Sequence, residues 1–185
     1  MPNLAGLLPV LTLLLGYGMK YFEDWVQHNR TLERERETRS ALRQDAIAER
    51  RTQFQRQTLL DLQPALMDLA RHTGKMHLHD LRGYRATNRF HAELYPSDVD
   101  EGFRSTSALI SMLAVRVNDA KVRVLTAAFK KAASDVGVAT NPTDSDSSVD
   151  TMSQLFVELQ ERVGVVLREL DEDDSKQQEG LTKKK

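Results

Sequence analysis

The residues best suited to chemistry stand together in the segment HTGKMHLHD, which contains His72, His77, His79 and Asp80. Imidazole nitrogens and carboxylate oxygens are ligands that zinc and iron accept. On a helix, however, His77 and His79 point about 200° apart. His72 and His79 could share one ion only if the chain bends at Gly74. These four residues are therefore candidate metal ligands, and the competing interpretation is ordinary polar side chains on a helix.

Other reactive patterns are absent from the sequence. The chain has no cysteine, which excludes disulfides, thiolate ligands and cysteine nucleophiles. It also lacks the Glu-x-x-His motifs of di-iron bundles and a glycine-rich phosphate loop. His28 and His91 are isolated, and no local pattern suggests a Ser-His-Asp arrangement. We predict no catalytic residue, no cofactor and no resident metal, which favours a binding or structural protein over an enzyme.

Composition favours an all-α protein. Only 6% of the 185 residues are aromatic and 29% are charged, and no segment alternates apolar and polar residues as a strand does. The formal net charge of −1 gives no field that would attract nucleic acid. We predict a transmembrane anchor over residues 1–25, a charged helical stalk over 26–57, an antiparallel three- to four-helix bundle over 58–170, and a disordered tail over 171–185.

The first of these segments is apolar. Residues 4–22 read LAGLLPVLTLLLGYGMKYF and contain one charge, Lys20. A helix of this length measures about 28 Å, close to the roughly 30 Å hydrocarbon core of a bilayer. Neither a positive charge before the run nor a small-residue cleavage site after it indicates a signal peptide. A buried N-terminal helix remains the alternative. The residues expected at the membrane interface are Tyr17, Lys20, Tyr21, Phe22 and Trp25.

The flanking charges predict a topology. No Lys or Arg precedes residue 4, whereas Lys20, Arg30 and Arg34 begin a series of basic residues after it. Basic flanks remain in the cytoplasm. We therefore expect a single-pass protein of the plasma (inner) membrane, with the N-terminus outside and the C-terminal domain cytoplasmic.

The stalk resembles part of a known family. An apolar N-terminus, the sequence MKYFEDW and a long charged helix look like the b-type stator subunits of rotary ATP synthases, over about the first third of the chain. The resemblance implies a structural stalk. Pro64, Gly74, Gly83 and Pro96 are expected to interrupt the continuous helix that such a stalk needs. We therefore do not assign the chain to that family.

Helical periodicity is strong after residue 57. Apolar residues recur at spacings of three and four, which predicts helices with one buried face each. We expect Pro64 in the first turn of a new helix, and Pro96 as the end of an element. Asp119 should begin the next helix, and Gly137 should end it. The following loop, GVATNPTDSDSS, should extend to a cap at Ser147 or Ser148.

Taken together, these patterns predict a membrane-anchored helical protein whose cytosolic bundle is an interaction or scaffold module. Its partners would be the bilayer and either an unidentified protein or a second copy. The alternatives are a metal-binding protein or enzyme that uses the histidine cluster, and a stator-like stalk. The apolar face of the last helix is either core or an exposed docking stripe, formed by Val149, Met152, Phe156, Leu159 and Val163.

Overall fold

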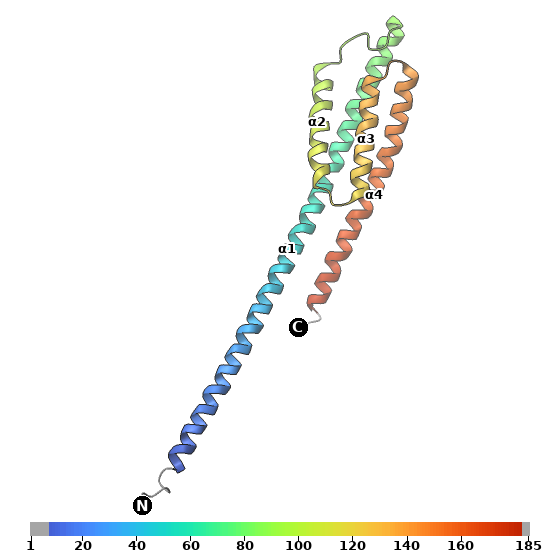
Figure 1. Cartoon of the computed structure of the whole chain (residues 1–185). Coiled ribbons are helices and arrows are strands. Elements are labelled where there is room, and N and C mark those ends of the chain that lie inside the picture. Colours follow the sequence, from blue (N-terminus) through green and yellow to red (C-terminus); the bar gives the residue numbers. More distant parts are fainter. Residues whose placement is uncertain (1–7, 183–185) are drawn as a thin grey trace, which may run out of the picture. The chain divides into compact units, whose positions relative to one another are not determined.

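The computed structural model describes the backbone of residues 8–182 and the side chains of Trp25 and residues 31–175. This part of the chain is helical and contains no strand, which confirms the all-α prediction (Figure 1). The contacts divide the chain into two units, Met1–Glu49 and Arg50–Lys185. The four helices are α1 (Leu8–Thr87), α2 (Ser97–Arg116), α3 (Ala120–Val138) and α4 (Pro142–Thr182).

In the first unit, the part of α1 that begins at residue 31 is polar and largely exposed. All side chains from residue 31 to residue 47 are exposed, including Leu42 and Ile47. Local pairs support the helix, such as Arg39 with Glu35 at 3.3 Å. Over the described residues, no helix contains a segment long and apolar enough to cross a bilayer. Apart from Trp25, the side chains of the predicted anchor lie outside the described residues, including those of four of its interface residues, Tyr17, Lys20, Tyr21 and Phe22.

The second unit is a four-helix bundle, in which short connections join antiparallel neighbours (Figure 1). The predicted apolar faces form one core, because each helix alone would leave its stripe in water. Leu62, Leu66 and Phe129 have no exposed surface. The core is drawn from all four helices and includes Leu59, Leu69, Ile110, Leu113, Val117, Val122, Leu125, Leu159 and Val163.

Pro64 lies inside α1 and does not begin a new helix. The expectation of a helix boundary there was wrong, as was the expectation that Gly74 and Gly83 interrupt the helix. Proline removes one backbone hydrogen bond and costs about 3 kcal/mol in a helix interior. Its ring lies on the exposed face, while Leu62 and Leu66 on either side are fully buried. Burial of this stripe offsets the loss.

Some helix ends lie where the sequence predicts them, and others do not. Asp119 caps α3 as predicted, and its side chain accepts a hydrogen bond from the Val122 amide at 2.7 Å. Gly137, in contrast, lies within α3. The predicted caps Ser147 and Ser148 lie within α4, which begins at Pro142. Asn141 accepts a hydrogen bond from the Asp144 amide at 2.9 Å, so Pro142 occupies the first helical position, which tolerates proline.

The predicted disordered tail is helical as far as Thr182, so that prediction was wrong for residues 171–182. Its acidic residues have a partner across the bundle. Arg56 of α1 contacts Asp171 at 2.5 Å and Asp174 at 2.9 Å. These contacts hold the residues that follow the last core residue of α4, an arrangement that composition alone did not reveal.

The possible docking stripe on α4 faces the core. Met152, Leu159 and Val163 are buried, and Phe156 is half-buried with its ring 5.9 Å from that of Phe129. Val149 is half-buried too. In the folded bundle, this stripe is covered by the other helices and is not exposed for a partner.

Candidate functional site: histidines and carboxylates at one end of the bundle

The connector between α1 and α2 folds back over the last turns of α1. Two of its residues adopt left-handed backbone conformations, Asn88 with φ of 58° and His91 with φ of 53°. Asn and His enter this region more readily than most residues. The Asn88 amide donates to the Tyr84 carbonyl at 2.7 Å, which ends the helix. The two turns bring His91 and Tyr95 onto Asp80.

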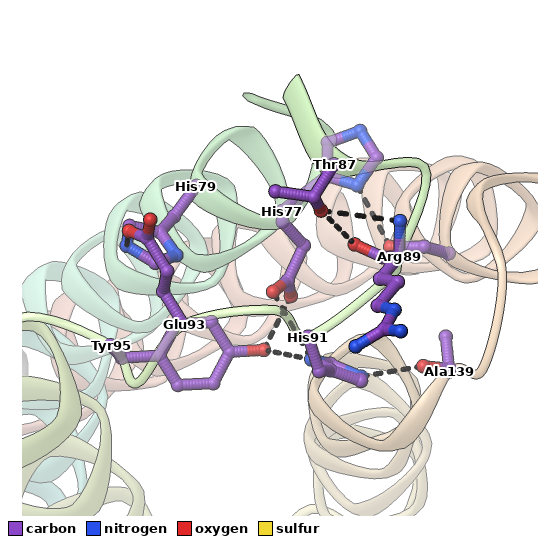
Figure 2. A network of polar contacts seen from close by, with 10 residues as sticks. His77, His79, Thr87, Arg89, His91, Glu93, Tyr95 and Ala139 are labelled. Carbon is purple, nitrogen blue, oxygen red and sulfur yellow. Dashed lines mark hydrogen bonds and ion pairs between the residues drawn. The ribbon is translucent and has the colours of Figure 1, made fainter. Parts of the chain in front are cut away.

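His91 joins two connections of the bundle. Its Nδ1 lies 3.1 Å from Oδ1 of Asp80, and its Nε2 lies 2.6 Å from the carbonyl oxygen of Ala139, at the end of α3. Figure 2 shows the ring between Ala139 and the hydroxyl of Tyr95. Both partners are acceptors, and only a doubly protonated imidazole donates from both nitrogens. The ring thus bridges the Asp80 carboxyl, whose side chain is 1% exposed, and the backbone at the end of α3.

Tyr95 completes the hydrogen bonding of Asp80. Its hydroxyl donates to Oδ2 of Asp80 at 2.5 Å. Burial raises the pKa of Tyr95 well above its usual value, and the hydrogen bond to Asp80 and the negative charges of Asp80 and Asp100 raise it further. Tyr95 consequently remains a donor. Each carboxylate oxygen of Asp80 has one partner, which is what a buried carboxylate requires.

His77 forms a second cluster, which links α1 to the first turns of α4. Its Nδ1 lies 2.8 Å from Oγ of Ser145 and its Nε2 lies 3.2 Å from Oδ1 of Asp146. The three residue types are those of a catalytic triad. Their exposure is the reverse of what hydrolysis needs, because Ser145 is 0% exposed whereas the side chain of Asp146 is 60% exposed. A buried hydroxyl offers no access to a substrate carbonyl, so the cluster fastens the helices together.

The remaining candidate ligands have separate surroundings. The Nε2 of His79 lies 4.0 Å from Glu93, and its ring meets Tyr95 edge to face at 5.7 Å. The ring of His72 packs against Gly102, and its Nδ1 is buried without a hydrogen-bond partner. Within the described part of the chain, no three His, Asp or Glu side chains are grouped to hold a metal ion. The four predicted candidates therefore do not form one site.

The Asp80–His91 pair also differs from a catalytic dyad. In a dyad, the imidazole nitrogen remote from the carboxylate receives a proton from the nucleophile. Here the Ala139 carbonyl occupies that nitrogen. Sequence reasoning missed His91, Tyr95 and Ser145 because their partners lie far along the chain, 48 residues away for His91 and Ala139. The only local sequence feature that pointed to this cluster was the spacing of four residues between His91 and Tyr95.

Comparisons of the chain with protein-family models, curated proteins and solved structures found no match.

Proposed function

We propose that the protein is a non-catalytic, single-pass membrane module that presents its helical bundle to the cytoplasm, where the bundle binds a protein partner or a second copy. The observation that carries the proposal is the exposure of every side chain from residue 31 to residue 47. A fully solvated helix between the apolar residues 4–22 and a packed bundle has the properties of a spacer.

Two further features support a binding role. Two of the histidines that could act on a substrate are engaged within the bundle, in the pairs His91–Asp80 and His77–Ser145. In addition, α2 leaves Leu109, Met112 and Val115 exposed on one side. Exposed apolar groups of this kind are common where proteins interact.

The anchor is tested by membrane fractionation. The wild-type protein should pellet with membranes, resist extraction by high salt and dissolve in detergent, since apolar burial is not screened by ions. The double variant Leu11→Arg plus Leu13→Arg should be released, because each arginine costs about 2.5–3.5 kcal/mol at a helix centre. The matched control is Leu42→Arg, at an exposed position. Release of the wild-type protein by salt alone would rule out the anchor.

The absence of cysteine provides a direct test of topology. Single substitutions Asn3→Cys and Asp45→Cys place one thiol on each side of the proposed span. A membrane-impermeant maleimide should label position 3 on intact cells and position 45 only after permeabilisation, because the basic flank remains inside. The opposite labelling pattern would reverse the proposed orientation.

A stator-like stalk is the second candidate function. It is favoured by the continuity of α1, which is helical from Leu8 to Thr87 despite Pro64. Such a stalk should be an elongated dimer in detergent. A monomeric mass by light scattering over a wide concentration range would exclude the stator-like stalk. The same result would leave self-association of the bundle without support.

A further inference from the structure

A surface pocket of about 310 Å³ lies between α1 and the beginning of α2. It is separate from the hydrogen bonds of Asp80 and His91, although His79 belongs to its wall. Residues from α1 supply one side, and the first residues of α2 and the preceding proline supply the other. The lining residues are Lys75, Leu78, His79, Arg82, Pro96, Asp98 and Val99.

The charges of the lining are predominantly positive. Lys75, His79 and Arg82 are spaced by four and three residues, so they lie on one face of α1. Two basic residues nearby have acidic partners: Arg71 lies 3.2 Å from Asp68, and Arg104 lies 2.7 Å from Asp100. Among the described residues, Lys75 and Arg82 form no such ion pair. Asp98 is the one acidic lining residue, which leaves an excess of positive charge.

The start of α2 adds no net positive charge to the pocket. Its N-cap position is Pro96, which provides no side-chain hydrogen bond. Asp98 and Asp100 in the first turn offset the partial positive charge of this terminus, so the positive charge of the pocket comes from Lys75 and Arg82.

The pocket also has apolar walls. Leu78 of α1 is 52% exposed, and Pro96 and Val99 belong to the lining on the side of α2. A ligand that fits both properties has one negatively charged group and a short apolar body. We propose that this pocket binds a small organic anion, whose carboxylate or phosphate group contacts Lys75 and Arg82 while its apolar part covers Leu78.

The test is a titration of the full-length protein in detergent, followed by NMR, with hexanoate, hexyl phosphate and inorganic phosphate as separate probes. Binding should shift the ring signals of His79 and the amide signals of Ser97 and Asp98 and leave those of α3 unchanged. Tighter binding of hexyl phosphate than of hexanoate would assign the anionic group as phosphate, and the reverse order would assign it as carboxylate. Inorganic phosphate should bind more weakly because it covers no apolar surface.

Substitutions separate a pocket from general attraction of ions. The double variant Lys75→Gln plus Arg82→Gln should lower the affinity at least roughly tenfold, because it removes both permanent cations. The control Arg71→Gln plus Arg85→Gln changes the net charge equally on the same helix outside the lining, and it should retain the wild-type affinity. Asp98→Asn should bind several-fold more tightly, because it removes the opposing carboxylate.

Three results would overturn the proposal. One is the absence of localised shifts in the wild-type protein at millimolar probe concentrations. Another is an equal loss of affinity in the control variant. The third is an unchanged or lowered affinity in Asp98→Asn. This substitution is at the surface, so its affinity can be measured even if the double variant does not fold.

Discussion

The imidazole of His72 on α1 occupies the space that a side chain at Gly102 of α2 would need. A Cβ atom at position 102 would stand 2.1 Å from Cε1 of His72, far inside van der Waals contact. The two helices approach closely at this point because one residue has no side chain. The glycine is therefore required by packing and not by backbone conformation, since the described glycines have negative φ angles.

Gly102→Ala should consequently destabilise the bundle by about 1–3 kcal/mol, the usual cost of overpacking. Replacing His72 by alanine in the Gly102→Ala variant should recover part of this loss. Urea denaturation of the wild type, the two single variants and the double variant would measure the recovery. Gly74→Ala is the matched control on α1. A methyl group there meets nothing within 4 Å, so it should stabilise the helix by about 0.5–1 kcal/mol. Equal effects at both glycines would contradict this account.

Gln55 ties α1 to the turn between α2 and α3. Its Nε2 donates to the Arg116 carbonyl and its Oε1 accepts from the Asn118 amide, both at 2.8 Å. Gln55→Leu leaves both backbone groups without this partner, and we expect a loss of about 1–3 kcal/mol in the free energy of unfolding. Gln57→Leu, whose side chain bonds only to the exposed Asp61, should change it by less than about 0.5 kcal/mol. A loss at Gln57 as large as that at Gln55 would show that the turn contacts are unimportant.

Asp119 should make stability depend on pH. Hydrogen bonds from Arg162, the shortest at 2.6 Å, lower the pKa of the Asp119 carboxyl, burial opposes them, and the Val122 amide lowers it further. Because the folded pKa lies below the unfolded one, the stabilisation is complete above the unfolded pKa of about 3.9 and is lost as the pH falls through the folded value.

The variant Asp119→Asn keeps a good capping side chain and removes the charge. It should be less stable than wild type at pH 7, and the difference should shrink below about pH 4 as the wild-type carboxyl is protonated. Asp119→Ala should lose about 1 kcal/mol more, because the cap is gone. Urea denaturation at a series of pH values measures both effects. A difference between wild type and Asp119→Asn that persists undiminished at the lowest pH would refute the charge-based explanation.

Pro64 is an exposed proline within a continuous helix. Pro64→Ala restores an amide that can donate to the Leu60 carbonyl and removes a steric conflict, so it should raise the free energy of unfolding by up to about 3 kcal/mol. Thermal unfolding would register this as a higher midpoint. A lower midpoint would mean that a bend at Pro64 is needed for α1 to follow the other helices.

Phe129 and Phe156 should differ in importance although their rings are in contact. Phe129 is 0% exposed, and its replacement by alanine should cost about 3–5 kcal/mol. Phe156 is half-buried, so its replacement should cost less, about 2 kcal/mol. Gln154→Ala, at an exposed site on α4, serves as a control and should change stability by less than about 0.5 kcal/mol. The order would be contradicted if Phe156→Ala were the more damaging variant.

The apolar stripes and the cap at Asp119 were predictable because they depend on local chain geometry. Leu59, Leu62, Leu66 and Leu69 recur with the helical period, and all are buried. Helix caps use residues within three positions of one another, as Asp119 and Val122 do. The sequence could therefore specify the fold class, most of the core and the start of α3 without knowledge of how the helices pack.

The tertiary structure decided the features that depend on distant partners. Local rules predict a helix boundary at Pro64 and a disordered tail from residue 171. Packing of the leucines that flank Pro64 keeps α1 continuous, and the contacts of Arg56 accompany the extension of α4. The histidine segment was read as one candidate site, yet His77 reaches Ser145 and Asp80 reaches His91. A helical period fixes the direction of a side chain from its own axis, but the groups it meets belong to other helices, and their burial energy exceeds the local preferences.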